Sequence, residues 1–203
     1  MPRVRSRRSA GLLLAVGLLV LAGCASEEEP ASDAALPVVV LDEDPGLEHV
    51  HGLGINPADE LLYVATHYGL WRVDDAGQAE RVGEHYLDLM GFTVVGADHF
   101  VASGHPPLTE ELPTHLGLIE TTDAGETWEP VSLFGQADFH ALRTAHGQLL
   151  GWDTVSGQLL VSDEGREWES RGEHAIYDIV PAPDDPDVLL ATVGLRPDDL
   201  DLV

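Results

Sequence analysis

The chain has 203 residues, 44% of them hydrophobic, which is enough apolar sequence for one domain with a core and too much for a disordered chain. Its single Cys excludes a scaffold held by intrachain disulfides. The 36 acidic residues outnumber the ten basic ones, all Arg, and the net charge of −26 excludes nucleic acid as a partner and favours cations or cationic ligands.

Residues 1–23 have the pattern of an export signal. Four Arg residues lie between positions 3 and 8, and an apolar run of 13 residues extends from Ala10 to Ala22. That run is short for a membrane span and typical of a secretory signal peptide. It ends in Leu21-Ala22-Gly23-Cys24, which resembles the bacterial lipobox. This resemblance implies cleavage before Cys24 and attachment of a lipid to its thiol. The alternative is an ordinary signal peptide with an incidental Cys.

Residues 24–37 are acidic and rich in Ala and Pro, and they predict a tether between a lipid and the domain that follows. The mature protein is therefore expected to be extracytoplasmic and anchored to the bacterial cell membrane. Without the first 23 residues, six Arg face 36 acids, and the net charge becomes −30.

Residues 38–194 consist of short strand-like runs between Gly, Pro, Asp and Asn, without a helical apolar period, so the sequence predicts an all-β fold. Three segments align with one another: they begin at Gly69, Gly117 and Gly157, and each has a second Gly eight residues later. Corresponding Asp residues lie at positions 75, 123 and 163. A period of this size in an all-β chain predicts propeller blades of four strands each.

The second and third segments continue to a Trp, giving Thr122-Asp-Ala-Gly-Glu-Thr-Trp128 and Ser162-Asp-Glu-Gly-Arg-Glu-Trp168. These resemble the Asp-box of BNR repeats, and residues 47–192 are similar to bacterial exported BNR propellers that are often labelled sialidase-like or glycosyl hydrolases. The resemblance implies a structural box in which Asp caps turn amides, Gly takes positive φ and Trp packs beneath the turn. The residues concerned are Asp123, Gly125, Trp128, Asp163, Gly165 and Trp168.

Four blade starts can be recognised, near His51, Met90, His140 and Tyr177, and residues 195–203 form an acidic tail without a strand pattern. The prediction is therefore an incomplete propeller of about four blades. Its exposed strand edges would be available to a protein partner, and Pro37 to Leu41 is a candidate for an outer strand that closes a ring.

Eight of the ten His residues fall on one predicted face, the one opposite the Asp-boxes, and only His99 and His146 fall on the other. His51, Met90 and His140 align at the starts of the innermost strands, and His67, His105 and Asp153 align at the ends of the second strands. Asp88 and Asp138 each precede a blade start by two residues. His49 and His115 belong to connections on the same face.

Imidazoles with carboxylates and one thioether are ligands that suit Zn or Cu, and Met90 would favour Cu. The predicted ligands of a metal ion, or of a small cationic molecule, are His51, His67, His105 and His140 first, and then His49, His115, Met90 and Asp153. The alternative is that these His residues hydrogen-bond to loop carbonyls or lie in solvent.

Two other functions stay open. Glycoside hydrolysis needs two separated carboxylates, which Asp88, Asp138 and Asp153 could provide on the predicted ligand face. Sialidase activity itself is disfavoured, because the Arg residues do not assemble into a clamp for a substrate carboxylate. The third function is that of a scaffold that binds another protein through the propeller face.

Overall fold

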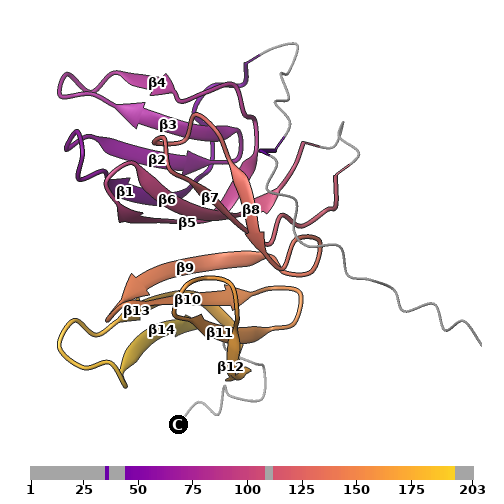
Figure 1. The fold of residues 1–203 in the computed structure, drawn as a ribbon. Coiled ribbons are helices and arrows are strands. Elements are labelled where there is room, and N and C mark those ends of the chain that lie inside the picture. Colours follow the sequence, from indigo (N-terminus) through magenta and orange to yellow (C-terminus); the bar gives the residue numbers. More distant parts are fainter. Residues whose placement is uncertain (1–34, 37–43, 108–111, 195–203) are drawn as a thin grey trace, which may run out of the picture. The chain divides into compact units, whose positions relative to one another are not determined.

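The computed structural model describes residues 35–36, 44–107 and 112–194. Contacts divide the chain into residues 1–30 and residues 31–203, and all described residues belong to the second unit. They form fourteen strands in three four-stranded sheets and one two-stranded sheet, each of them antiparallel between sequence neighbours (Figure 1). Among the described residues, no helix is long and apolar enough to cross a membrane. The fold is the predicted all-β one.

Each sheet is one propeller blade, and its strands follow the order of the chain. Blade 1 contains β1 (Val50–Ile55), β2 (Leu62–Thr66), β3 (Gly69–Val73) and β4 (Ala79–Arg81). Blade 2 contains β5 (Asp88–Gly96), β6 (His99–His105), β7 (Leu118–Thr121) and β8 (Glu129–Ser132). Blade 3 contains β9 (Phe139–Ala145), β10 (Gln148–Asp153), β11 (Gln158–Ser162) and β12 (Glu169–Glu173), and blade 4 contains β13 (Ile176–Pro181) and β14 (Leu189–Val193).

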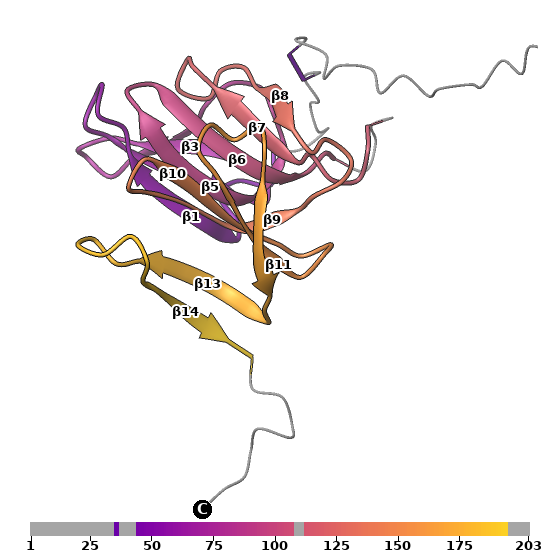
Figure 2. The same cartoon turned by 60° about the horizontal axis from the view of Figure 1, so that its bottom comes forward.

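The first strands of consecutive blades pack against one another, β1 on β5, β5 on β9 and β9 on β13. These contacts make them the inner strands of an open series of blades. Blade 4 lies at one end of the series (Figure 2). The structure therefore has the incomplete propeller architecture that the repeats predict.

A hydrophobic core fills each junction between neighbouring blades. Tyr63 and Leu70 of blade 1 share one cluster with Phe92 and Trp128 of blade 2. Two further clusters join blade 2 to blade 3 and blade 3 to blade 4. Since every cluster takes residues from two blades, an isolated blade has no core of its own, and removal of apolar area from water couples the blades in sequence.

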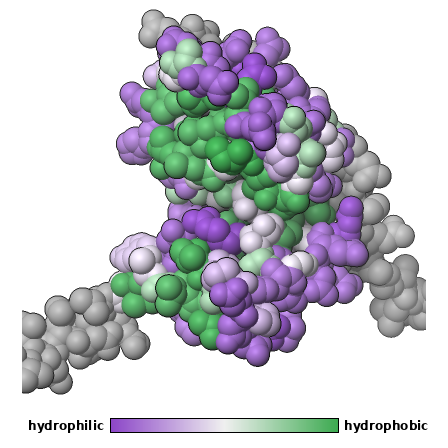
Figure 3. Space-filling view, turned by 90° about the vertical axis from the view of Figure 1, so that its left-hand side faces the viewer, coloured by the Kyte–Doolittle hydropathy of each residue, from purple (hydrophilic) through white to green (hydrophobic). Residues whose placement is uncertain are grey.

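The ends of the series expose apolar side chains that have no next blade to cover them. On β1, Leu53 is 62% exposed and Ile55 57%, and on blade 4, Leu190 is 70% exposed. Figure 3 shows a continuous hydrophobic area on one side of the half that holds blades 1 and 2, and smaller areas on the lower half. The segment Pro37 to Leu41 lies outside the described residues, but Leu36 is buried at blade 2, where its N–H donates to Trp128 O at 2.7 Å.

The Asp-box residues have structural positions in the outer turns. Asp123 accepts hydrogen bonds from the Thr127 N–H at 2.9 Å and from the Thr127 hydroxyl at 2.7 Å, and Gly125 has a φ of 102°. Trp128 is buried in the core between blades 1 and 2. A Cβ on Gly125 would lie 2.4 Å from Leu70 Cδ2, so this turn presses directly on the preceding blade.

The third blade keeps the Gly and Trp of this arrangement, but among the described residues Ser162 and not Asp163 caps the turn amide. Gly165 has a φ of 74°, its N–H donates to Ser162 Oγ at 2.8 Å, and its missing Cβ leaves room for Leu118 of blade 2. Trp168 stacks near Phe139, with ring centroids 4.7 Å apart. Asp163 accepts from Gln148 Nε2 at 2.9 Å.

In blade 1 the turn is capped by Asp74, one residue before the aligned Asp75, because Asp74 Oδ1 accepts from the N–H groups of Ala76 and Gln78. The aligned glycines, Gly69 and Gly77, have positive φ like those of the other two blades, but the cap comes from Asp74 and not from the aligned Asp75.

Every inner strand contains a β-bulge near its start. Near that start the pairing register skips one residue in each blade, and these unpaired residues are His51, Met90, His140 and Tyr177. A bulge releases one residue from the ladder and changes the direction of its side chain. The four predicted blade starts are thus the four bulge residues, at equivalent positions of the repeat.

Candidate functional site: two His/Asp groups at successive blade junctions

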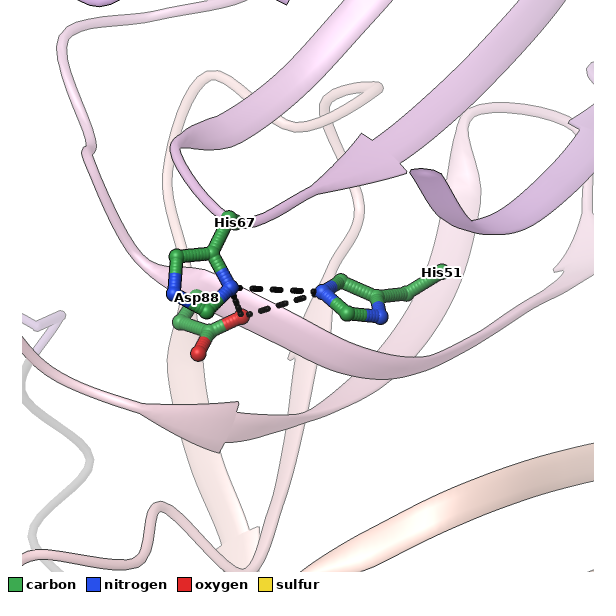
Figure 4. A group of neighbouring side chains, drawn as sticks. All are labelled: His51, His67 and Asp88. Carbon is green, nitrogen blue, oxygen red and sulfur yellow. Dashed lines mark hydrogen bonds and ion pairs between the residues drawn. The ribbon is translucent and has the colours of Figure 1, made fainter. Parts of the chain in front are cut away.

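The first group of site residues lies at the junction of blades 1 and 2. His51 is the bulge residue of β1, His67 directly follows β2, and Asp88 is the first residue of β5. His51 Nε2 lies 3.4 Å from His67 Nδ1 and 3.5 Å from Asp88 Oδ1, and His67 Nδ1 lies 3.2 Å from the same carboxylate oxygen (Figure 4). Three potential ligand atoms from two blades therefore converge on one point.

The group is only partly open to solvent. The side chains of His51 and Asp88 are 19% and 17% exposed, whereas that of His67 is 43% exposed. Asp88 Oδ1 is itself buried and has no hydrogen bond of ordinary geometry within the described residues. A buried carboxylate oxygen without such a bond costs free energy unless a cation compensates it.

Burial sets the direction of both pKa shifts in this group. It lowers the pKa of His51, and the charge of Asp88 opposes this effect, so burial favours the neutral imidazole. Burial also raises the pKa of Asp88, against the lowering effect of the neighbouring imidazoles, with His67 first. Neutral imidazole is the form that binds a metal ion.

The three separations match the edges of a tetrahedral coordination site. Bonds of about 2.0–2.1 Å to a tetrahedral ion place neighbouring ligand atoms about 3.3–3.4 Å apart. The observed edges are 3.2, 3.4 and 3.5 Å. Three such atoms leave a fourth position open to water or a ligand, as in catalytic zinc sites.

The second group lies one junction further, between blades 2 and 3. His105 ends β6, Asp138 directly precedes β9, and His140 is the bulge residue of β9. His140 Nε2 lies 2.9 Å and His105 Nε2 3.6 Å from Asp138 Oδ2. The ligand atoms of all three residues lie within 4.8 Å of one another.

The second group is more strongly hydrogen-bonded than the first. Asp138 Oδ2 also accepts from the Thr154 hydroxyl at 2.7 Å, while the buried Asp138 Oδ1 has no hydrogen bond in the described part of the chain. Burial of Asp138 acts to raise its pKa, but the hydrogen bonds from His140 and Thr154 outweigh burial and the pKa is lowered. The Asp138 carboxylate is therefore held in its ionised form.

The backbone fixes the orientation of His105. Its Nδ1 lies 2.9 Å from the carbonyl oxygen of Thr114 and can only donate to it. That hydrogen bond assigns the proton of the neutral ring to Nδ1 and leaves the Nε2 lone pair facing the group.

Asp153 does not belong to either group, and its predicted equivalence with His67 and His105 is wrong by one residue. Asp153 pairs with Phe139 across the ladder, and its carboxylate accepts from Asp138 N, Val155 N, Ser156 N and the Ser156 hydroxyl. In each blade one residue of the second strand pairs with the residue just before the bulge: Thr66, Gly104 and Asp153. Thr154 directly follows this residue in blade 3, as His67 and His105 do in blades 1 and 2. A shift of one residue in a strand reverses the side-chain direction. The Asp153 carboxylate therefore accepts hydrogen bonds within the turn, and the Thr154 hydroxyl donates to Asp138 in the second group.

Two further predicted ligands lie beside the groups. The His49 ring centroid is 5.5 Å from that of His67 and 6.4 Å from that of His51, and His49 has a φ of 47°, which is unusual for a residue with a side chain. The His115 ring is 5.5 Å from His105. Met90, the bulge residue of β5, holds the position in blade 2 that His51 holds in blade 1.

The remaining four histidines have other surroundings. His99 and His146, predicted for the opposite side, lie at the β5–β6 and β9–β10 turns, where His99 pairs with Glu120 at 3.0 Å and His146 contacts Ala182 O at 2.8 Å. His85, predicted for the ligand face, is buried, and its carbonyl carbon and oxygen pack against Gly69. His174 is exposed between blades 3 and 4, with Nε2 3.4 Å from Arg171 O.

Sequence reasoning found the His residues but missed Thr154 and Thr114, which support the second group. Counting from the bulge would have aligned Thr154 with His67. No sequence pattern indicated the contact between His105 and the Thr114 carbonyl, since this contact depends on the path of the β6–β7 connection.

The comparisons with known proteins give a fold and no family. No protein-family model matches the chain, and no curated protein matches it. Among solved structures, the chain is similar to an ancestral GH74 enzyme at 13% identity and a TM-score of 0.52, over 79% of this chain and 23% of that one. The chain thus spans about a quarter of the length of that enzyme, and the likeness supports the propeller-like fold.

Proposed function

We propose that this protein binds one divalent transition-metal ion, Zn²⁺ or Cu²⁺, through His51, His67 and Asp88. The observation that carries the proposal is the triangle of ligand atoms with edges of 3.2, 3.4 and 3.5 Å. Its dimensions suit a tetrahedral ion, and imidazole nitrogen with carboxylate oxygen is a ligand set that both metals accept.

The surroundings support a cation in preference to an empty hydrogen-bonded cluster. Three close polar atoms would include repulsive lone-pair contacts in the absence of a proton or a cation between them. The buried Asp88 Oδ1 lacks an ordinary hydrogen bond that would satisfy it. A bound cation would satisfy all three atoms at once, and the net charge of −26 would attract it.

The test is metal analysis of the full chain without a His-tag, after dialysis against a limiting concentration of Zn²⁺ or Cu²⁺. We expect bound metal in the wild type and one ion fewer per chain in the His51→Ala, His67→Ala double variant. The matched control is His99→Ala with His146→Ala, which removes two imidazoles at the turns away from the groups. Absence of metal from the wild type, or an unchanged number of ions per chain in the first variant, contradicts the proposal.

We further propose that the protein is a lipoprotein outside the cytoplasm, anchored at Cys24. The support is the sequence alone, because residues 1–34 lie outside the described part. Mass spectrometry of protein from a membrane fraction should find a diacylglyceryl group on Cys24 as the first residue. The Cys24→Ser variant should lose it. An unmodified Cys24, or one that follows uncleaved residues, contradicts this proposal.

Glycoside hydrolysis is the second candidate. It is favoured by the GH74 enzyme among the structural neighbours and by two carboxylates at successive inner strands, the partly buried Asp88 and the buried Asp138. Sialidase activity is not proposed, because Arg143 pairs with Asp178 at 2.6 Å. Release of sugar from a panel of aryl glycosides, abolished by Asp138→Asn, would support hydrolysis. No release from any member of the panel would count against it.

A further inference from the structure

The two His/Asp groups are connected through one pair of residues. Asp88 of the first group lies directly opposite His105 of the second in the β5–β6 ladder. Directly opposite residues point to the same side of a sheet, with Cβ atoms about 4.5–5.5 Å apart. Asp88 is therefore a cross-strand neighbour of a residue in the second group while its own Oδ1 completes the first.

Only one of the two oxygens of Asp88 takes part in the first group. Oδ1 lies between His51 and His67, and Figure 4 shows the other carboxylate oxygen turned away from both imidazoles. His105 and His140 also act electrostatically on Asp88, in addition to His51 and His67. All four imidazoles thus lie within electrostatic range of this one carboxylate.

The second group has its own free ligand atoms. His105 Nδ1 contacts the Thr114 carbonyl, so Nε2 is the ring nitrogen that faces the group, and Asp138, whose side chain is 5% exposed, has a buried Oδ1 without a hydrogen-bond partner among the described residues. An ionised carboxylate with an unsatisfied buried oxygen is a place where a cation lowers the free energy.

We propose that the site is a two-metal centre in which Asp88 is the bridging carboxylate. Oδ1 binds the ion held by His51 and His67, and the second oxygen binds an ion held by His105, His140 and Asp138. The inference rests on the proposed metal binding at the first group and extends it. Two cations bridged by a carboxylate form the arrangement that binds and polarises oxyanions in metallohydrolases. Phosphate or carboxylate esters are the substrate class that such a centre would take.

The test is a titration of the metal-free full chain with Co²⁺, followed by electron paramagnetic resonance. We expect two ions per chain, with a signal per ion that is smaller for the second equivalent than for the first, because bridged Co²⁺ ions couple magnetically. The His105→Asn, His140→Asn double variant should bind one ion and give the full signal of an isolated ion. These conservative replacements keep polar side chains, and circular dichroism verifies the fold.

The outcomes separate the two proposals. A wild type that binds no metal overturns both. A wild type that binds one ion, or two ions with the full uncoupled signal, overturns the bridged centre and leaves the single site in place. Retention of two ions by the His105→Asn, His140→Asn variant also overturns it. Loss of the coupling in Asp88→Asn supports it, and persistence of the coupling in that variant overturns it.

Discussion

The Thr154 hydroxyl donates a 2.7 Å hydrogen bond to Asp138 Oδ2 from the place in the repeat where the two preceding blades have His67 and His105. The third blade therefore has a hydroxyl where the others have an imidazole. This difference makes Asp138 the most strongly hydrogen-bonded carboxylate of the two groups.

Replacing Thr154 by Val should raise the pKa of Asp138, because the hydrogen bond from Thr154 is one of the causes that lower it. Carbon-13 NMR of the carboxyl group during an acid titration measures the change. Thr144→Val, an exposed position of the same blade, is the control and should leave this pKa unaltered. An unchanged value in Thr154→Val would show that the hydrogen bond is absent in solution.

The Asp88→Asn variant should lower the pKa of His51 further in the metal-free protein. Burial lowers this pKa and the Asp88 charge opposes the lowering, so loss of the charge leaves burial less opposed. Proton NMR of the imidazole measures the shift, and Glu120→Gln, whose carboxylate pairs with His99, serves as control. A rise in the pKa of His51 would contradict the assignment.

The same burial predicts a loss of stability in mild acid. The His51 imidazole takes up a proton near pH 6.5 when the chain is unfolded but only at lower pH when it is folded. Between these values the unfolded state binds more protons, so the free energy of unfolding falls as the pH is lowered from about 6.5. Urea denaturation between pH 7 and pH 5 should show a smaller decrease in His51→Gln than in the wild type, and equal slopes would contradict the prediction.

Asp123→Ala should lower the free energy of unfolding by about 1 kcal/mol, because it removes the acceptor for the Thr127 N–H and hydroxyl. Asp74→Ala should have a similar effect in the corresponding turn of blade 1. Asp75→Ala is the matched control, since Asp75 is exposed and caps no amide in the described residues. A larger loss for Asp75→Ala than for Asp74→Ala would contradict the assignment of the cap to Asp74.

Gly125→Ala should destabilise the protein more than Gly77→Ala. Both glycines have positive φ, 102° and 77°, so each Ala variant has a conformational cost of about 1 kcal/mol. Only Gly125 faces a close neighbour, the buried Leu70 at 2.4 Å from an added Cβ, whereas nothing lies within 4 Å at Gly77. Overpacking should add about 1–2 kcal/mol. Thermal unfolding of both variants measures the difference, and equal midpoints would contradict the contact between blades.

Leu53→Glu should leave the fold intact and reduce self-association. Leu53 is 62% exposed on β1, at the end of the blade series, and belongs to an apolar surface that favours contact with another protein. Light scattering at increasing concentration measures association, and Val155→Glu, at a position that is 54% exposed in a turn of blade 3, is the control. Equal association of the two variants would contradict a role for this edge.

The repeat pattern was sufficient to predict the blades because turn chemistry is local. Gly and Asp residues that cap a hairpin act within a few positions of one another, so Gly125 and Trp128 could be assigned from letters alone. The convergence of His51 and His67 was also predictable, since a propeller brings the start of one strand and the end of the next to the same face. The contact of Asp88 with His51 and His67 was harder to predict, because it joins residues of two different blades.

The errors had one physical origin. Asp153 was misplaced by a single residue, and the turn of blade 1 is capped by Asp74, one residue before the aligned Asp75. In a strand or turn a single residue decides which way a side chain points. Bulges and tight turns determine this direction, and a single sequence contains no reliable pattern that locates them. Only the pairing of Asp153 with Phe139 revealed the correct alignment.

The recurring bulge has a further consequence for how such a protein can diversify. Because the extra residue makes no ladder pair, its identity is free of the demands of sheet formation, and the four blades accordingly carry an imidazole, a thioether, a second imidazole and a phenol there. New chemistry can be introduced at any of these points by one codon change while the scaffold around it remains intact.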